Sequence, residues 1–526
     1  MEKRWIKNLE SVPFERVLEQ IGNVGRYQVI VFFAINWGYL CVTGSMLCSM
    51  YDTILPSINC TNATPEIINE TIHSAWNTTD FRSLLLDFGY LCEHTYLSTL
   101  VGTTVMLGGV LGATICAFVA DRIGRKPVTL ISITLVILLN FLLSGIGLVS
   151  WYLTLVIMFC MGFFGGGYMV VNMVLLLESV GGQYWRLGVT SLNGWPFGLM
   201  VMAFIGYLTA YWRYYHLVLG LTACPAVVAQ YFFVHESARW LIQHHRIKEA
   251  HVILEQMAKV NGKHLDLKTL VNTESTPTIS SETSQTLDPS LNRKYNYLDL
   301  IKHRVIIVYL SALFYSWLAS SIVSFGIYFN MKNLAGNRFL NTFYLGLFKG
   351  VSGCIPFLVS KWCGRKPILL VSASVACLAS WAAVAVYFFY PLDAKHNPWL
   401  TAFALLGATS IDPIWKINHL YSTELFPTVV RNMARAVCNI GSRIGSVIGP
   451  QTELLEKYNA GAPFVLFGTL SILHVIVCAI FLPETKGKPL PDKLPGEDQH
   501  TQNSCAQTNV ELMPKSPDSK CAADSL

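Results

Sequence analysis

Twelve apolar runs, each long enough to cross a lipid bilayer, alternate with polar segments along the chain. The hydrocarbon core of a bilayer is about 30 Å thick, so a spanning helix needs about 20 predominantly apolar residues. The runs cover residues 27–50, 98–120, 128–149, 151–177, 187–210, 214–234, 304–330, 340–360, 367–389, 398–421, 432–452 and 463–482. This pattern predicts an all-α membrane protein with twelve transmembrane helices.

The composition supports this prediction. Of the 526 residues, 52% are hydrophobic and 13% are charged, whereas soluble globular proteins carry about 25% charged residues. So little charge excludes a soluble multi-domain enzyme, a disordered chain and a nucleic-acid-binding protein. Nothing at the N-terminus resembles a cleaved signal peptide, because five basic residues precede the first apolar run.

The distribution of Lys and Arg predicts the orientation in the membrane. If both termini are cytoplasmic, 28 of the 38 Lys and Arg residues lie in cytoplasmic segments and six lie outside, as the positive-inside rule requires. The net charge of +6 then reflects topology and not an acidic partner. The predicted segments are an N-tail (1–26), an external loop (51–97), a cytoplasmic linker (235–303) and a C-tail (483–526).

The external loop carries the features expected of a segment exposed to the secretory pathway. Four Asn-x-Thr sequons predict glycosylation at Asn59, Asn62, Asn69 and Asn77. Cys60 and Cys92 are the two cysteines in extracellular loops, and an oxidising compartment favours a disulfide between them. Two free thiols are the alternative. We expect the other twelve cysteines to be reduced, small apolar residues.

A short cytoplasmic motif occurs twice. Gly124-Arg-Lys-Pro127 follows the second span and Gly364-Arg-Lys-Pro367 follows the eighth, which predicts a parallel duplication into six-helix halves at 27–234 and 304–482. Glycine permits a tight turn, and we expect the basic residues to pair with acidic helix ends across the interface between the halves. Breaking those pairs would open an inner gate. In the alternative interpretation, these charges only set topology.

The motifs together resemble the major facilitator superfamily, and more specifically its organic cation, organic anion and carnitine transporter family (solute carrier family 22). The matching stretches include Glu236-Ser-Ala-Arg239-Trp-Leu, the segment from Tyr421 to Arg431, and Pro483-Glu-Thr-Lys-Gly487. His235 replaces the usual proline, and Lys361 stands where the first half has an aspartate. We expect a cytoplasmic gate formed by Asp121, Arg122, Arg125, Glu178, Glu236, Arg239, Arg365, Glu424 and Arg431.

Four ionisable residues fall deep within predicted spans: Lys349, Asp412, Lys416 and Arg443. A charge near the bilayer midplane is costly and marks a functional site by default. Asp412 and Lys416 are spaced i,i+4 and are expected to pair on one helix face. In the rival interpretation, Lys416 contacts substrate or Asp412 takes up a proton. Lys349 and Arg443 have no acid in their own helices and are expected to be unpaired, unless an acid elsewhere pairs with them or Lys349 snorkels.

The family resemblance gives these two cations a meaning. Cation carriers of the family tend to have Asp at the position of Arg443, whereas anion and carnitine carriers have Arg; Lys349 stands where members commonly carry an acid. A guanidinium can hold a carboxylate or sulfate bidentately. The resemblance also places Ser324 and Phe325 facing the pore, with Tyr328 and Trp415 as further substrate-contacting candidates; packing is the alternative role for these aromatic residues.

We therefore predict a plasma-membrane secondary transporter of small organic ions, most consistent with organic anions such as carboxylates, working by alternating access. The alternatives are a carnitine-like zwitterion or organic cation carrier, and a non-transporting receptor or partner protein on the same fold. No Walker loop, metal-spaced His/Cys cluster or nucleophile elbow is present, so no enzyme activity, metal or cofactor is expected. Expected partners are the substrate, the bilayer and a counter-ion or exchanged anion. The terminal Asp524-Ser525-Leu526 fits a PDZ groove, although so short a match also arises by chance.

Overall fold

The computed structural model describes residues 14–55, 74, 79–90, 94–264, 300, 302–390, 397–427, 430–459 and 461–487. Within these residues the chain is helical, with one isolated β-bridge between Arg82 and Tyr211. The four sequons, Cys60 and Cys92, most of the second part of the linker and the C-terminal tail lie outside the described residues. The ten described cysteines are free, in agreement with the prediction for them.

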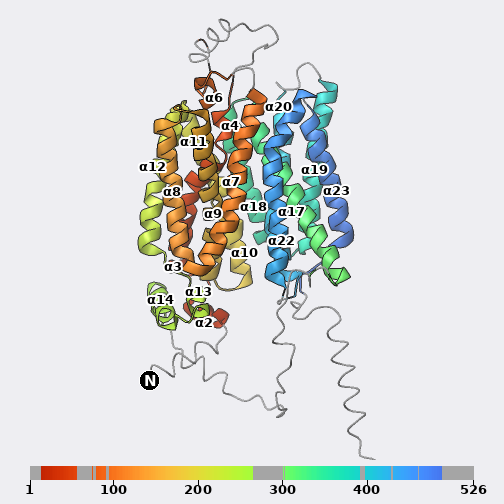
Figure 1. The fold of residues 1–526 in the computed structure, drawn as a ribbon. Coiled ribbons are helices and arrows are strands. Elements are labelled where there is room, and N and C mark those ends of the chain that lie inside the picture. The colour runs from red at the N-terminus through yellow and green to blue at the C-terminus, as the bar shows by residue number, and fades with distance from the viewer. Residues whose placement is uncertain are drawn as a thin grey trace, which may run out of the picture.

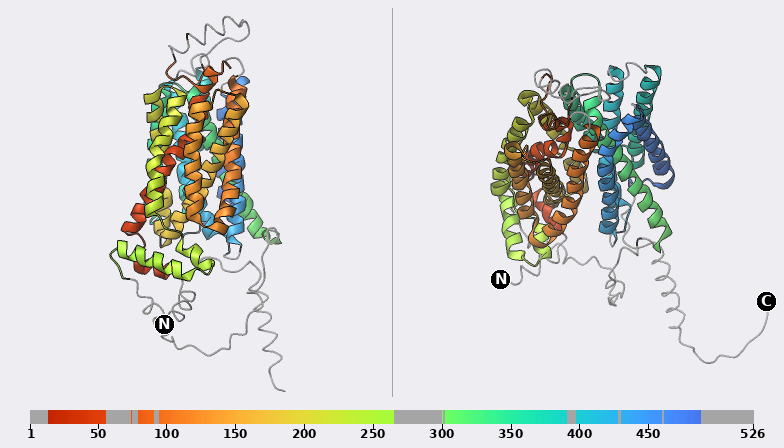
Figure 2. Two further views of the ribbon diagram at one scale, coloured as in Figure 1. Left: turned by 60° about the vertical axis from the view of Figure 1, so that its left-hand side comes forward. Right: turned by 45° about the horizontal axis from the view of Figure 1, so that its top comes forward.

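The helices form two bundles that stand side by side, one from each half of the sequence (Figure 1). The N-terminal half contains α3 (Arg26–Met46), α4 (Ser49–Asp52), α6 (Leu84–Asp87), α7 (His94–Ile123), α8 (Arg125–Ile146), α9 (Trp151–Ser179), α10 (Gln183–Ser191), α11 (Trp195–Thr209) and α12 (Trp212–Phe233). The C-terminal half contains α17 (Arg304–Asn330), η3 (Met331–Asn333), α18 (Arg338–Val359), α19 (Arg365–Phe389), α20 (Pro398–Ser410), α21 (Asp412–Glu424), α22 (Arg431–Gln451), η5 (Thr452–Lys457) and α23 (Ala462–Phe481). The right-hand view of Figure 2 separates the same two groups of helices.

Within the described part of the chain, ten helical segments are long and apolar enough to cross a membrane. The remaining two predicted spans, 398–421 and 432–452, are not among these ten, for different reasons. The first is broken into α20 and α21 at Ile411, beside Pro413, which has no N–H to continue the helical hydrogen bonding. The second is the single helix α22, which carries Arg431, Arg435 and Arg443. These arginines make α22 more polar than the ten apolar helices. Both lie within the C-terminal bundle (Figure 1).

The packing repeats between the halves, as the duplicated motif predicts. Helix α3 packs against α11, and α17 packs against α22; in the same way, α8 packs against α12 and α19 packs against α23. Each half is thus held together by the same two helix pairs. The helices of each half therefore pack mainly against one another. Such internal packing is needed if each half is to move as a rigid unit.

Small residues bring α7 and α9 into close contact. A side chain added at Gly112 would collide with the backbone of Phe163, and one added at Gly166 would collide with the backbone of Gly109. Membrane helices commonly associate through such small residues because lipid offers no hydrophobic drive for helix association. The closest helix pair of the N-terminal half therefore depends on glycine.

A small helical layer covers one end of the N-terminal half. It consists of α2 (Phe14–Ile21), α13 (Ala238–Gln243) and α14 (Ile247–Val260), at the lower edge of Figure 1 and Figure 2. Asn261 joins this layer to the bundle, because its amide donates to the Ile21 carbonyl at 3.1 Å and accepts from the Tyr27 N–H at 2.9 Å. The first part of the linker is thus attached to the N-terminal half.

The glycine contact can be tested with Gly112→Val. Overpacking a tight helix contact costs about 1–3 kcal/mol or more, and here the collision is with backbone, which has no rotamer by which to yield. We expect a large loss of monodisperse protein in detergent and a lower melting temperature. Gly145→Val is the control, since nothing lies within 4 Å of the added Cβ at that position of α8. Equal stability of the two variants would contradict the packing argument.

Candidate transport site

The duplicated cytoplasmic motif builds the same structure in each half. The carboxylate of Glu236 accepts from the backbone N–H of Arg125 at 3.0 Å, at the start of α8. Glu484 accepts from the backbone N–H of Arg365 at 2.9 Å, at the start of α19. Each glutamate therefore satisfies free donors at a helix N-terminus, where the helix dipole also favours negative charge.

Glycine is required at both turns. Gly124 has φ +111°, in the region that favours glycine, and a side chain there would also collide with Glu236. Gly364 has an ordinary φ, but a side chain there would collide with Glu484. The glycines thus let the capping carboxylates approach the backbone.

The predicted ion pairs across the interface are wrong for this conformation. Arg125 pairs with Asp121 at 3.0 Å and with Glu178 at 3.3 Å, all in the N-terminal half. Arg365 pairs with Glu424 at 3.3 Å, both in the C-terminal half. Arg125 and Arg365 therefore brace their own bundles, since Glu178 lies in the last turn of α9 and Glu424 ends α21, each within the same half as its arginine.

The other predicted gate residues are more dispersed. The guanidinium of Arg122 lies 4.2 Å from the centre of the Phe118 ring on the same helix. Arg239 is exposed. The Nε–H of Arg431 donates to the Phe426 carbonyl at 3.2 Å.

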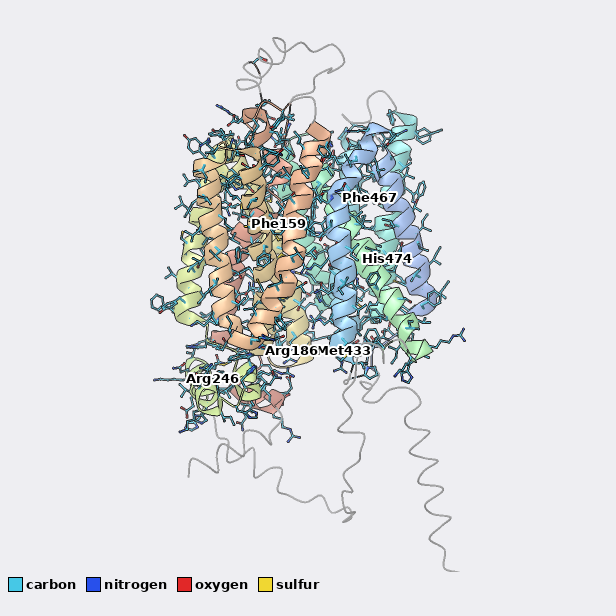
Figure 3. All side chains as sticks on the ribbon, viewed as in Figure 1. Phe159, Arg186, Arg246, Met433, Phe467 and His474 are labelled. Carbon is cyan, nitrogen blue, oxygen red and sulfur yellow. The ribbon has the colours of Figure 1, made fainter. Side chains whose placement is uncertain are left out.

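Aromatic side chains connect the halves at the end of the bundles that carries the duplicated motif. The Tyr184 ring of α10 lies 4.6 Å from Phe357 of α18, and the Lys361 ammonium lies 4.7 Å from the Tyr184 ring centre. A cavity of about 250 Å³ opens beside them. Both halves line it, with Tyr184 and Leu187 from one and Ser360, Lys361, Arg365, Leu420 and Glu424 from the other. Arg186 and Met433 mark this end of the two bundles in Figure 3.

The opposite end is closed by a polar cluster that the sequence reasoning missed. This outer cluster consists of Thr53, Ser98, Lys332 and Glu453. The Lys332 ammonium pairs with Glu453 at 2.9 Å within the C-terminal half. Thr53 accepts from Lys332 at 2.9 Å and Ser98 donates to Glu453 at 3.0 Å, both from the N-terminal half. Lys332 lies in η3, directly after α17, and Glu453 lies in η5, directly after α22. The sequence does not reveal that these two residues pair, because they are far apart along the chain.

The intramembrane charges form a triad in place of the predicted pair. Asp412 lies 3.6 Å from the Lys416 ammonium, as predicted, and 3.7 Å from that of Lys349. The prediction that Lys349 is unpaired is therefore wrong, because α18 brings it against Asp412 of α21. Lys349 also donates to the Ala408 carbonyl of α20 at 3.0 Å. All three side chains are buried, with 1% exposure for Lys349.

Arg443 differs from the triad. Among the described residues, no carboxylate lies within ion-pair distance of Arg443, and its Nε has no hydrogen-bond partner. The residue is partly exposed, and Tyr39 of the N-terminal half lies near enough to interact with it electrostatically. By contrast, Arg435 on the same helix lies 3.4 Å from His419. Arg443 is thus a cation that faces the other half.

The predicted aromatic residues divide into two groups. Phe325 and Tyr328 of α17 gather around Trp195 of α11, whose indole donates to the Tyr328 hydroxyl at 3.2 Å. The Lys349 ammonium lies 5.3 Å from the Tyr328 ring centre, so this group joins the charged triad to the N-terminal half. Trp415 instead packs edge-on against Trp317 within the C-terminal half, and Ser324 is buried in α17. Trp195 was missed because an apolar run does not identify which aromatic faces the interface.

Comparison with known proteins supplies the family. The family model described as "Sugar (and other) transporter" matches residues 26–492. The chain belongs to that family. Relatives of the chain include solute carrier family 22 proteins, so the predicted resemblance is confirmed. The chain is a multi-pass membrane transporter of the major facilitator superfamily.

Three of these relatives illustrate the similarity. The solute carrier family 22 member 15-like protein of Xenopus tropicalis is 28% identical over 423 residues, covering 80% of this chain and 82% of that protein. The organic cation transporter protein of Drosophila melanogaster is 27% identical, with coverage of 88% and 83%. The organic cation/carnitine transporter 2 of Mus musculus is 29% identical, with coverage of 78% and 71%.

Solved structures of similar fold support the helical architecture of this chain. The xylose transporter XylE from E. coli in an inward open conformation gives a TM-score of 0.61 at 16% identity, covering 88% of this chain and 98% of that chain. Its partially occluded inward open form gives 0.59. The predicted all-helical fold is therefore confirmed.

The C-terminal cap gives a testable pH dependence. Burial raises the pKa of Glu484, but donation from the backbone N–H groups of Lys486, Arg365, Lys366 and Thr485 outweighs burial and lowers the pKa below its ordinary value. The stabilisation is therefore present at neutral pH and is lost as the pH falls through the lowered pKa.

We expect the melting temperature of the wild type to fall on acidification from about pH 5 to about pH 3, a range that starts near the ordinary glutamate pKa and extends below it. Glu484→Gln should melt lower at neutral pH and respond less to acid, as followed by intrinsic fluorescence. Glu249→Gln is the control, since that exposed residue of α14 pairs with exposed Arg246. The argument fails if Glu484→Gln shows the acid response of the wild type.

Proposed function

We propose that this protein is a plasma-membrane secondary transporter of small organic anions, carboxylates foremost, that works by alternating access. One observation carries the proposal: Arg443 is a partly exposed cation in the membrane with no carboxylate partner among the described residues. An unpaired charge in a bilayer is costly and is retained where a ligand uses it.

The local charge balance supports an anionic substrate. Lys349, Lys416 and Asp412 together carry a net charge of +1, because two ammonium groups share one carboxylate. Arg443 adds a second positive charge from α22. The net charge of these four residues is the one expected from unpaired Lys349 and Arg443. The difference is that Lys349 shares Asp412 with Lys416. Such a field attracts anions and opposes the entry of organic cations.

The chemistry of the proposed anchor fits carboxylates. A guanidinium presents a planar fork that can donate two parallel hydrogen bonds to a carboxylate or sulfate. The cluster of Trp195, Phe325 and Tyr328 offers apolar surface for the rest of the molecule, as in sites with few polar anchors. We assign Arg443 as the anchor, since Lys349 is buried against Asp412 and the Ala408 carbonyl.

The contacts between the halves support alternating access. The outer cluster joins the two bundles at one end, whereas both halves line a cavity of about 250 Å³ at the other end. The ion pairs of the duplicated motif lie within each half. Each bundle would therefore keep its internal contacts while it rocks around the site between the halves.

A second candidate substrate class comes from the relatives. Two of them are named as an organic cation transporter and an organic cation/carnitine transporter. A zwitterion of the carnitine type would place its carboxylate on Arg443 and its ammonium against aromatic faces. Asp412 is a poor partner for that ammonium, because two lysines already share it.

Uptake measurements distinguish these classes. Cells expressing the protein at a clamped membrane potential should take up labelled benzoate faster than labelled tetraethylammonium or carnitine. Uptake of the ammonium alone would overturn the anion assignment, and uptake of carnitine alone would favour the zwitterion. Absence of all flux, with normal surface expression, would favour a non-transporting receptor on the same fold.

Variants of the anchor test its role. Loss of charge-assisted hydrogen bonds worth about 1.5–3 kcal/mol should lower benzoate uptake about 10- to 100-fold in Arg443→Gln. Arg443→Lys should retain part of the uptake, because it keeps the charge and loses the fork. Arg246→Gln, on the exposed face of α14, is the control. Unchanged selectivity in Arg443→Asp would remove Arg443 from the site.

A further inference from the structure

A second buried ionic group lies in the N-terminal half, away from the triad and Arg443. Asp52 of α4 and His216 of α12 are each 0% exposed, and their Oδ2 and Nε2 atoms lie 3.0 Å apart. The other ring nitrogen of His216, Nδ1, lies 2.8 Å from the side-chain oxygen of Asn140, which is also fully buried. The proposed transport site uses none of these three residues.

The hydrogen bonds around Asn140 fix where the protons are. Its amide nitrogen lies 2.8 Å from the Val136 carbonyl, which can only accept, and 2.8 Å from the Ser45 hydroxyl. This network assigns the amide nitrogen as the donor on that side and the amide oxygen as the acceptor facing His216. The His216 Nδ1 must then carry a hydrogen.

One further proton is required between His216 and Asp52. With Nδ1 protonated, a neutral imidazole would turn the lone pair of Nε2 toward the carboxylate oxygen. Two acceptors cannot share a 3.0 Å contact in a buried site without repulsion. Either Nε2 is protonated and faces a carboxylate, or Asp52 is protonated and donates to Nε2. In both cases the pair holds one dissociable proton.

The surroundings offer no other charge to compensate for loss of that proton. No Lys or Arg among the described residues pairs with Asp52, and its second oxygen, Oδ1, has no hydrogen-bond partner. The titratable groups around the pair are neutral side chains: Cys48 lies beside Asp52, Tyr51 precedes Asp52 in α4, and the Tyr215 ring packs edge-on against His216. Cys41 of α3 lies 3.7 Å from the Asn140 amide nitrogen. Trp212, whose ring lies 6.5 Å from that of His216, donates to Asp87, which pairs with Arg82.

The pair is linked to the closure of the outer end. Asp52 ends α4, and the next residue is Thr53, whose hydroxyl accepts from the Lys332 ammonium and lies 3.0 Å from the Ser98 hydroxyl in the outer cluster. Ile54 follows and lines the small cavity beside Lys332 and Glu453. Any movement of α4 that separates Asp52 from His216 therefore also moves a residue that joins the two halves.

We propose that Asp52 and His216 form a proton-binding site through which external protons hold the outer end closed. Proton uptake permits the close contact between the two residues and keeps Thr53 on Lys332. Loss of the proton to external water makes the contact repulsive and favours separation of the outer cluster. The inference rests on the alternating-access part of the proposed function, and it does not depend on which substrate is carried.

The test measures opening of the outer end directly. Ile54→Cys places a thiol at a position with 5% exposure in the closed outer end. Cells are treated with a membrane-impermeant, positively charged methanethiosulfonate at about pH 6 and about pH 8, on either side of the ordinary imidazole pKa. Tyr458→Cys, at a position with 89% exposure, corrects for the reactivity of the thiol itself and reports the amount of protein at the surface.

The variants remove the proton site while preserving the hydrogen bond. Asp52→Asn can donate an amide hydrogen to neutral Nε2 and so needs no dissociable proton, and His216→Gln removes the imidazole. His474→Gln is the matched control, because His474 is also buried but lies 2.8 Å from the neutral Ser316 hydroxyl in the C-terminal half. His474 is labelled in Figure 3.

We expect the corrected labelling rate to rise at least about fivefold from the lower to the higher pH, the lower end of usual coupling between two sites. The rise should persist in His474→Gln and vanish in both Asp52→Asn and His216→Gln. A rate independent of pH in the wild type, a rise preserved in Asp52→Asn, or a rise lost equally in His474→Gln would overturn the proposal. Because labelling needs no substrate, these outcomes are separate from failure of benzoate uptake.

Discussion

The cost of leaving a charge or a polar group without a partner in hydrocarbon governs this structure. Lys349, Asp412, Lys416, Asp52 and His216 are buried in the membrane helices and each has a charged or polar partner. Arg443 has no carboxylate partner among the described residues, and it faces the boundary between the halves. Breaking a buried ion pair typically costs about 3–5 kcal/mol. Partners therefore determine which helices must touch: Asp412 of α21 requires Lys349 of α18, and Asp52 of α4 requires His216 of α12.

The same requirement explains why the chain repeats its cytoplasmic motif with such close geometric agreement. Glu236 and Glu484 come from segments that follow the last helix of each half, yet each reaches back to the helix that follows the Gly-Arg-Lys-Pro turn. Lys126 and Lys366 donate to the carbonyls of Tyr231 and Ala479 in the same way. A carboxylate thus closes each bundle on itself, and the ion pairs of Arg125 and of Arg365 each lie within one half.

Much of this could be predicted from the sequence, and the limits have physical causes. Apolar runs and the duplicated motif are local signals, so the helices, the repeat and the pairing of Asp412 with Lys416 follow from spacing alone. The partner of Lys349 lies on another helix, and the i,i+4 rule is silent about such contacts. The outer cluster and the pair of Asp52 with His216 were also missed because the partners lie on different helices. In addition, their four ionisable residues lie near helix ends, where charged residues are common and do not by themselves indicate a site. The break at Pro413 was missed because membrane helices often tolerate proline.

The ionic contacts are distributed unevenly between the two faces, and this asymmetry has a kinetic consequence. At the end that carries the duplicated motif, Arg125 and Arg365 each pair within their own half, so the proposed rocking motion would leave both of these ion pairs intact. At the outer end, hydroxyl groups must leave Lys332 and Glu453, and water must take their place. Opening of the outer cluster would then be the slowest step of a transport cycle. The rate of that cycle would depend on the composition of the solution that bathes the outer cluster.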